Sequence, residues 1–243
     1  MIEPCRSTGS PLELAEESER LATVIQIKRD GHVIAEQLEP LRGEFARQHC
    51  VLLPQLLEPA LLEYLLRQLT SSRFITKFET DQQHEFGKVL FVPETEPVLF
   101  VFHLLLNNRK LFRALELITN CRPIGNFSGR IHQSVAGSAH QIAWHGDNAD
   151  DRLLGLTINL GTQSYAGGVF QLRRKDSEQI VCEVRRKQAG DAFVFRISPD
   201  LQHRLTLTEN HGRRTVGVGW FRAKPDFRSF ARSYFQFVTP QTQ

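Results

Sequence analysis

Eight short segments between residues 124 and 223 alternate apolar and polar side chains, and this pattern constrains the fold more than any other feature. Alternation of this kind places successive side chains on opposite faces of a β-strand, and turn residues separate the segments. Short strands at this spacing, with no helical pattern between them, are typical of an all-β barrel or a double-sheet jelly roll. The expected strands cover residues 129–135, 141–144, 153–160, 168–172, 180–184, 192–197, 203–207 and 214–221.

The chain before residue 124 has mostly helical periodicity instead. Leucines recur three and four residues apart over 59–71, and a second apolar stripe runs over 96–120 with an interruption at Asn107 and Asn108. Both patterns predict amphipathic helices, the first of which begins at a proline suited to a first turn.

Other parts of the N-terminal half predict smaller elements. Residues 1–20 predict a loose lead-in, 24–27 and 50–53 predict short strands, and 32–48 predicts a helix or two pieces broken at Pro40. Residues 72–93 predict strands or loops near a site opening.

We therefore expect a single α+β domain over residues 1–243. Residues 1–123 form mainly helical support and substrate-side elements, 124–223 form the β-barrel core, and 224–243 form a C-terminal extension. A chain of 243 residues with 41% hydrophobic side chains is long enough to bury a sizeable core.

Charge and cysteine usage exclude several classes of function. A formal net charge of +3 is too small over this length to indicate a nucleic-acid or membrane partner. The four cysteines are widely separated and form no CxxC pair, which argues against a disulfide framework or a zinc knuckle and suits a reducing cytoplasm. No signal-peptide pattern and no apolar stretch of about 20 residues is present, so we expect a cytoplasmic protein.

The segment WHGDN at residues 144–148 carries the clearest chemical signal. Residues two apart in an extended chain project to the same side, so His145 and Asp147 can point at one ion. A third ligand must come from elsewhere, and His203 follows a predicted turn further along the chain. Two imidazoles and one carboxylate on one face of an octahedral ion leave three positions open, which is the ligand set of non-haem Fe(II) oxygenases.

These three ligands do not choose the metal by themselves. Catalytic zinc also accepts two histidines and a carboxylate, so a zinc hydrolase on a barrel remains an alternative at this point. A His-x-Asp pair is also common in solvated loops, and this chain has nine histidines. The interpretation therefore depends on the residues that follow His203.

Arg214, at the start of the last expected strand, supplies that context. A dicarboxylate that chelates iron through its keto-acid end needs a cation for its distal carboxylate, and arginine offers two parallel hydrogen bonds. The residues after Arg214 alternate valine and tryptophan with glycine, as in a strand that lines a barrel. Arg213 would face the opposite side, so we prefer Arg214 as the anchor.

The order of these motifs resembles a known family. The segments WHGD (144–147), LTINL (156–160), YAGGVFQL (165–172), AGDAFVFR (189–196), and then HR, GRR and GWF between 203 and 221 are similar to the 2-oxoglutarate/Fe(II) oxygenases of the prolyl-4-hydroxylase-like group. The resemblance covers residues 124–223 and implies a double-stranded β-helix barrel. It also implies Fe(II) as the metal, with 2-oxoglutarate and O₂ as co-substrates and succinate and CO₂ as co-products.

By position, the resemblance makes His145, Asp147 and His203 the catalytic iron ligands and Arg214 the residue that anchors 2-oxoglutarate. Asn159 stands where the family often has a tyrosine that assists the anchor, and its amide could also donate to a carboxylate. The retained Asp147 argues against halogenating relatives, in which a small residue vacates this position.

Two further departures bear on co-substrate and substrate. Val216 replaces the small hydroxyl residue that the family usually has two positions after the anchor. Trp220 stands where the nucleic-acid demethylases carry a second arginine, which argues against a nucleic-acid substrate.

The expected reaction is hydroxylation, or another oxidation, of an unactivated C–H bond of an amino acid, a peptidyl residue or a small metabolite. The alternative is a non-catalytic barrel that senses a metal or 2-oxoglutarate. We expect Trp144 and Trp220 to serve as barrel packing, and we regard Arg130, His132 and His140 as secondary candidates for the lining of the site.

Overall fold

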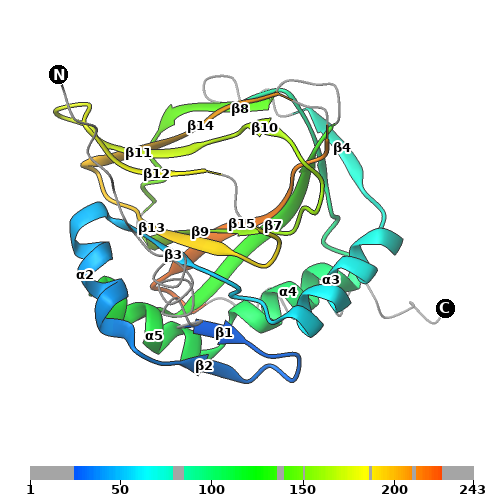
Figure 1. Ribbon diagram of the computed structural model, residues 1–243, viewed down its shortest axis with the longest axis horizontal. Coiled ribbons are helices and arrows are strands. Elements are labelled where there is room, and N and C mark those ends of the chain that lie inside the picture. The colour runs from blue at the N-terminus through cyan, green and yellow to red at the C-terminus, as the bar shows by residue number, and fades with distance from the viewer. Residues whose placement is uncertain are drawn as a thin grey trace, which may run out of the picture.

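Two antiparallel β-sheets face each other in the computed structural model, which describes residues 25–78, 85–135, 140–149, 151–185, 188–209 and 212–225 (Figure 1). The minor sheet has the order β12 (Ile180–Val184), β11 (Phe170–Arg174), β14 (Leu201–Glu209), β8 (His140–His145) and β5 (Glu85–Phe86), with β10 (Ala166–Gly167) also paired to β14. The major sheet has the order β3 (Cys50–Leu53), β13 (Ala192–Arg196), β9 (Arg152–Asn159), β15 (Thr215–Arg222), β7 (Asn126–Ser134), β6 (Lys88–Phe91) and β4 (Ile75–Phe78). This is the jelly-roll arrangement that the strand pattern predicts.

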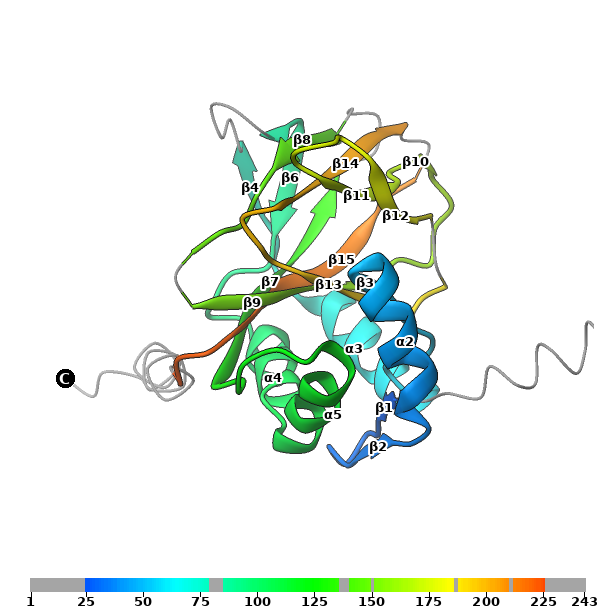
Figure 2. The same ribbon diagram turned by 90° about the vertical axis from the view of Figure 1, so that its left-hand side faces the viewer.

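Helices cover the face of the major sheet that points away from the minor sheet (Figure 2). Pro59 and Pro97 stand in the first turns of α3 (Pro59–Ser71) and α4 (Pro97–Leu106), where a missing N–H costs nothing. The Asn108 side chain caps α5 (Arg109–Thr119) by accepting the N–H of Lys110 at 2.8 Å. A two-stranded hairpin precedes the helices in the chain. The helices are α2 (Leu38–Gln48), α3 (Pro59–Ser71), α4 (Pro97–Leu106) and α5 (Arg109–Thr119), and the hairpin is β1 (Ile25–Ile27) with β2 (Val33–Ala35).

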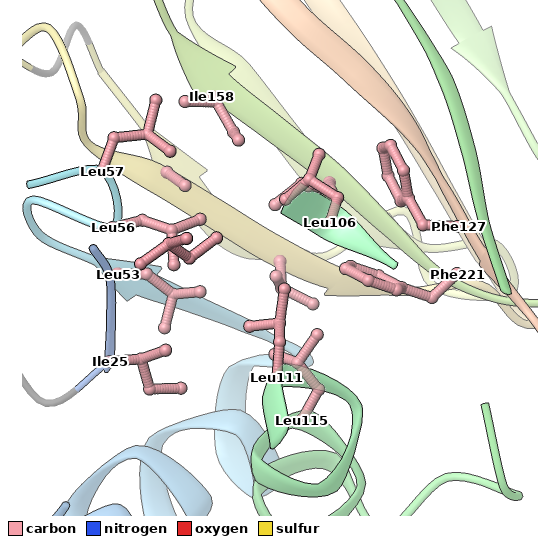
Figure 3. Close-up of a cluster of buried hydrophobic side chains, with 14 of the residues drawn as sticks. Ile25, Leu53, Leu56, Leu57, Leu106, Leu111, Leu115, Phe127, Ile158 and Phe221 are labelled. Carbon is pink, nitrogen blue, oxygen red and sulfur yellow. The ribbon is translucent and has the colours of Figure 1, made fainter. Parts of the chain in front are cut away.

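The main hydrophobic core lies between these helices and the major sheet (Figure 3). Leu111 and Leu115 of α5 and Phe127 and Phe221 of the sheet are each almost fully buried in it. The outward-facing glycines of β15 permit close packing, because a Cβ atom at Gly217 would lie 2.5 Å from the Phe102 ring. The alternation of glycine with larger residues therefore puts the helices on one face of β15 and leaves the other face for the barrel interior.

The described part of the N-terminal half contains strands as well as four helices, so the expectation of a mainly helical half is not confirmed. Strands β3, β4 and β6 extend the major sheet and β5 extends the minor sheet. Strand β3 confirms the strand expected over 50–53, and β4, β5 and β6 lie in the segment 72–93, for which strands or loops were expected. Strands this short carry no distinct period, and their long-range partners decide them. Pro40 does not break a helix but lies in the first turn of α2, and the chain before it forms β2.

The remaining expectations have simple outcomes. The break at Asn107 and Asn108 separates α4 from α5, and each of the eight expected barrel strands overlaps an observed one. Residues 1–20 and most of the C-terminal extension, 224–243, lie outside the described residues. Cys50, Cys121 and Cys182 are free thiols. No helix in the described ranges combines the length and apolar character required to cross a bilayer.

Gly155 in β9 provides a test of the barrel packing. A Cβ atom there would lie 2.1 Å from the Phe195 ring, and Phe195 in turn packs on His203 with ring centroids 4.7 Å apart. Overpacking costs about 1–3 kcal/mol, so we expect Gly155→Ala to lower the melting temperature by about 2–12 °C. Thermal unfolding followed by circular dichroism measures this change.

The matched control is Gly43→Ala in α2, where the nearest atom to an added Cβ lies 3.5 Å away, at the end of the Arg47 side chain. Alanine is a better helix former than glycine, so this variant should unfold at the same temperature or a higher one. Equal melting temperatures for Gly155→Ala and the unchanged protein would contradict the packing argument.

Candidate metal and co-substrate site

Strand pairing brings His145 and His203 together. His145 is the last residue of β8, His203 lies near the start of β14, and the two are direct partners across the minor sheet. Side chains at such positions begin about 5 Å apart on the same face, and the two imidazole rings have centroids 4.2 Å apart. The register of one antiparallel pair therefore places two potential ligands side by side.

Asp147 completes the cluster from the loop that follows β8. Its Oδ2 lies 3.5 Å from Nε2 of His203, and its Oδ1 lies 3.9 Å from Nε2 of His145. One ligand atom from each of the three residues lies within 4.8 Å of the others, a spacing that could hold a metal ion. The structure thus brings together the three residues that the sequence predicts as iron ligands.

The surroundings of the two imidazoles bear on their ability to bind a metal. Nδ1 of His145 donates to the Ala143 carbonyl oxygen at 2.9 Å, so Nε2 is the ring nitrogen that remains for a metal. Burial, and next the neighbouring His145, lower the pKa of His203 to about 3. His203 is therefore neutral at physiological pH, as a metal ligand must be, and a donor set of two imidazoles and a carboxylate suits Fe(II).

Two further side chains hold the Asp147 carboxylate. The indole Nε1 of Trp220 donates to Oδ2 at 2.7 Å, and Nη1 of Arg152 lies 3.4 Å from Oδ1. The Arg152 guanidinium lies over the Trp220 ring at 3.8 Å. Contacts of this kind orient a metal ligand and tune its basicity.

Sequence reasoning missed both of these roles. We expected Trp220 to be simple barrel packing, but it is a hydrogen-bond donor to Asp147. Its position six residues after Arg214, which puts both side chains on the same side of an extended chain, was the available signal. Nothing in the sequence pattern singles out Arg152, which reaches Asp147 only because the loop after β8 folds back toward the start of β9. Trp144 contacts two guanidiniums, those of Arg173 and Arg204, at 4.3 and 4.6 Å.

Replacing Trp220 by phenylalanine tests the hydrogen bond separately from the packing. Trp220→Phe keeps an aromatic ring under Arg152 but removes the donor to Asp147. We expect Fe(II) affinity to fall by about 10- to 100-fold, the usual effect of losing such a partner of a ligand. Competition with a chromophoric chelator measures the change, and an unchanged affinity would show that the indole N–H does not support the carboxylate.

A cavity of about 330 Å³ opens between the two sheets and contains the three residues of the cluster. Phe170, Phe193 and Phe195 provide much of its apolar wall, and they pack against one another with ring centroids 4.7 to 6.3 Å apart. Arg130 and His132 also line it, whereas His140 is fully buried beside His132. An apolar cavity with a few convergent polar groups has the character of a small-molecule site.

Arg214 lines this cavity and is only 7% exposed. Its main chain is fixed by two contacts with the end of β7: the Arg214 N–H donates to Oγ of Ser134 at 3.1 Å, and the Ser134 N–H donates to the Arg214 carbonyl at 2.9 Å. Arg213 is exposed and lines a different surface pocket. Its main-chain N–H donates to Oε1 of Gln163 at 2.9 Å. The alternation of side chains therefore separates the two arginines as the sequence predicts.

Asn159 lies beside Arg214 rather than in the main cavity. It lines a small adjoining space of about 30 Å³ together with Arg214 and Thr157. Its Oδ1 accepts the N–H of Gly161 at 3.1 Å, so its amide nitrogen is the atom that could reach a carboxylate. Its assignment to the co-substrate stays a prediction.

No family model matches the chain, and no curated protein matches it. Solved structures do. A prolyl-4-hydroxylase from Pseudomonas putida is 18% identical, with a TM-score of 0.56 over 77% of this chain and 100% of that one. A prolyl hydroxylase from Trichoplax adhaerens, in complex with a hypoxia inducible factor oxygen degradation domain peptide fragment, is 12% identical, with a TM-score of 0.57 over 94% and 99%.

A third structure extends the comparison to another reaction. The non-heme alpha ketoglutarate dependent epimerase from nogalamycin biosynthesis is 13% identical, with a TM-score of 0.53 over 76% of this chain and 80% of that one. At these identities the likeness concerns the fold. The chain has the jelly-roll fold of 2-oxoglutarate/Fe(II) oxygenase structures, including prolyl hydroxylases, with a His-Asp-His cluster that could hold a metal in its barrel.

Proposed function

We propose that the protein is an Fe(II)- and 2-oxoglutarate-dependent dioxygenase. The observation that carries this proposal is one cavity that holds both the His145–Asp147–His203 cluster and the buried guanidinium of Arg214. A metal-binding cluster alone would suit several functions. A buried arginine in the same small cavity adds a place for the distal carboxylate of a co-substrate that chelates the metal.

Each residue then has a defined task. His145, Asp147 and His203 hold the metal on one face, and Trp220 keeps the Asp147 carboxylate in orientation. Arg214 binds the distal carboxylate of 2-oxoglutarate, assisted by the Asn159 amide. The phenylalanine wall formed by Phe170, Phe193 and Phe195 keeps bulk water from the site.

The bound Fe(II), together with 2-oxoglutarate and O₂, supplies the oxidising power, and succinate and CO₂ are the co-products. The protein needs no acid–base residue for this chemistry; its residues bind, orient and exclude water. The substrate is an amino acid, a peptidyl residue or a small metabolite, whose unactivated C–H bond is hydroxylated or otherwise oxidised. Support for a peptidyl substrate comes from the structural neighbour that holds a peptide fragment.

The test is spectroscopic and then chemical. Anaerobic addition of Fe(II) and 2-oxoglutarate should produce a weak visible charge-transfer band, and admission of O₂ should release succinate. A band without succinate, with or without candidate substrates, would favour the non-catalytic sensor. Zinc retained through purification, with activity that does not require O₂, would favour a hydrolase and contradict the proposal.

A further inference from the structure

The described residues that line the cavity carry four guanidinium groups but only one carboxylate, that of Asp147. Under the proposed function the formal charges of Fe(II), Asp147, 2-oxoglutarate and Arg214 cancel, because a histidine that binds a metal does so as the neutral imidazole. Two more arginines, Arg152 and Arg204, remain on the lining even when Arg130 is left aside. A site with this charge is complementary to a negatively charged substrate.

Arg152 is the better placed of these two arginines. Its guanidinium lies over the Trp220 ring, 3.8 Å from the ring centre, and the ring restricts its position, while 27% of its side chain stays exposed. Within the described ranges its hydrogen bonds involve Nη1 alone, which contacts the carboxylate and the carbonyl oxygen of Asp147 at 3.4 and 3.5 Å. Nε and Nη2 thus remain available to a ligand, as a fork that suits a carboxylate.

Arg204 is engaged differently. Its Nε donates to Gln171 at 2.7 Å, and its guanidinium lies 4.6 Å from the centre of the Trp144 ring. Neither of these partners lines the cavity. Arg204 therefore adds positive potential at the site, whereas Arg152 offers directed donors next to the metal cluster.

We propose that Arg152, held against Trp220, forms a carboxylate-binding subsite for the substrate that the enzyme oxidises. This substrate is accordingly an organic acid or a residue with an acidic group. This inference rests on the proposed function for the meaning of "substrate". Because Arg152 touches Asp147, an acid bound to its other edge has its neighbouring carbons close to the metal. The contact with Asp147 does not compete strongly, since a divalent cation draws the charge of that carboxylate to itself.

The experiment measures binding without turnover. The protein is loaded with Zn(II), which does not activate O₂, and saturated with 2-oxoglutarate so that Arg214 is occupied. Ligand-observed NMR then compares N-acetyl amino acids with their carboxamides, and the blocked amides of aspartate and glutamate with those of asparagine and glutamine. The first pairs place the carboxylate on the main chain and the second pairs place it on the side chain.

We expect acids of one of these two series to bind at least about tenfold more tightly than the matched neutral amides, as a charge-assisted pair of hydrogen bonds implies. In Arg152→Gln this preference should disappear, and in Arg152→Lys it should be reduced. Arg113→Gln, an exposed arginine on α5 whose side chain is 81% exposed, is the matched control and should keep the preference.

Trp220→Phe separates this role from simple support of Asp147. It removes the donor to Asp147 but keeps a ring beneath Arg152, so metal affinity should fall while the preference for acids remains. A preference that survives Arg152→Gln, equal binding of acids and amides, or no binding of any acid in the millimolar range would overturn the inference. Failure of the proposed function would give a different result. In that case 2-oxoglutarate would not bind the Zn(II) protein, or its binding would not depend on Arg214.

Discussion

His145→Ala is expected to abolish the visible charge-transfer band and the release of succinate. The substitution removes one of three metal ligands, and the remaining histidine and carboxylate cannot fix the metal on one face. Changes to residues that merely support ligands already cost about 10- to 100-fold, so loss of a ligand should exceed this range. Metal content after dialysis, the anaerobic difference spectrum and succinate formation measure the effect.

Stability should not confound this result. The His145 side chain is 18% exposed and faces the cavity, so its truncation removes little packing. His32→Ala, at an exposed histidine in the β1–β2 hairpin, is the matched control and should retain the band. If His145→Ala bound Fe(II) and released succinate like the unchanged protein, the metal assignment would be wrong.

Arg214→Gln is expected to lower the affinity for 2-oxoglutarate by about 10- to 100-fold, which is measured as a higher KM or Kd for this co-substrate. The glutamine keeps hydrogen-bonding capacity but loses the charge and the two parallel donors, and such charge-assisted bonds are each worth about 1.5–3 kcal/mol. Arg214→Lys keeps the charge without the fork and should be intermediate. Titration of the charge-transfer band with 2-oxoglutarate measures the affinity directly.

The adjacent residue provides the control. Arg213→Gln changes the net charge by the same amount, but its side chain is exposed on the other face of the chain. It should leave the affinity for 2-oxoglutarate within about twofold, since exposed charges at this distance are screened by solvent. Equal losses in the two variants would indicate a general electrostatic effect and would contradict an anchoring role for Arg214.

The Trp220–Arg152 stack links the two halves of the site. Trp220 orients the metal ligand Asp147 through its N–H and supports Arg152 through its ring. Under our proposals, the same residue therefore positions the metal and the substrate. Its variants should be interpreted with this double contact in mind, which is why Trp220→Phe, which keeps the ring, is more informative than a truncation.

Much of the site was predictable because its spacing is local or follows from strand alternation. His145 and Asp147 are two positions apart, so the two-residue period of an extended chain puts their side chains on the same face. Arg213 and Arg214 are adjacent, so their side chains lie on opposite faces. The same period predicts the glycine face of β15, although the structure was needed to show that α4 packs there. The barrel strands were predictable for the same reason.

The N-terminal half shows where sequence patterns stop. Strands β3 to β6 are two to four residues long, and they exist because partners in distant parts of the chain complete their hydrogen bonds. A run of four apolar residues carries no period that separates a strand from a buried helix end. The sequence predicted the strand over 50–53 but left 72–93 open between strands and loops, and the expectation of a mainly helical half is not confirmed.

The sequence by itself determined the His145–Asp147 pair, the choice of Arg214 over Arg213 and the alternating strands, because each depends on short separations along the chain. His203 was predicted from its place in the order of motifs. Only the tertiary structure decided that His203 lies opposite His145, that Trp220 donates to Asp147 and that Arg152 lies on Trp220 beside the cavity. Those contacts join segments that are far apart in sequence or meet across a folded loop. Register between strands and the path of that loop are set by packing of the whole domain, which no single segment encodes.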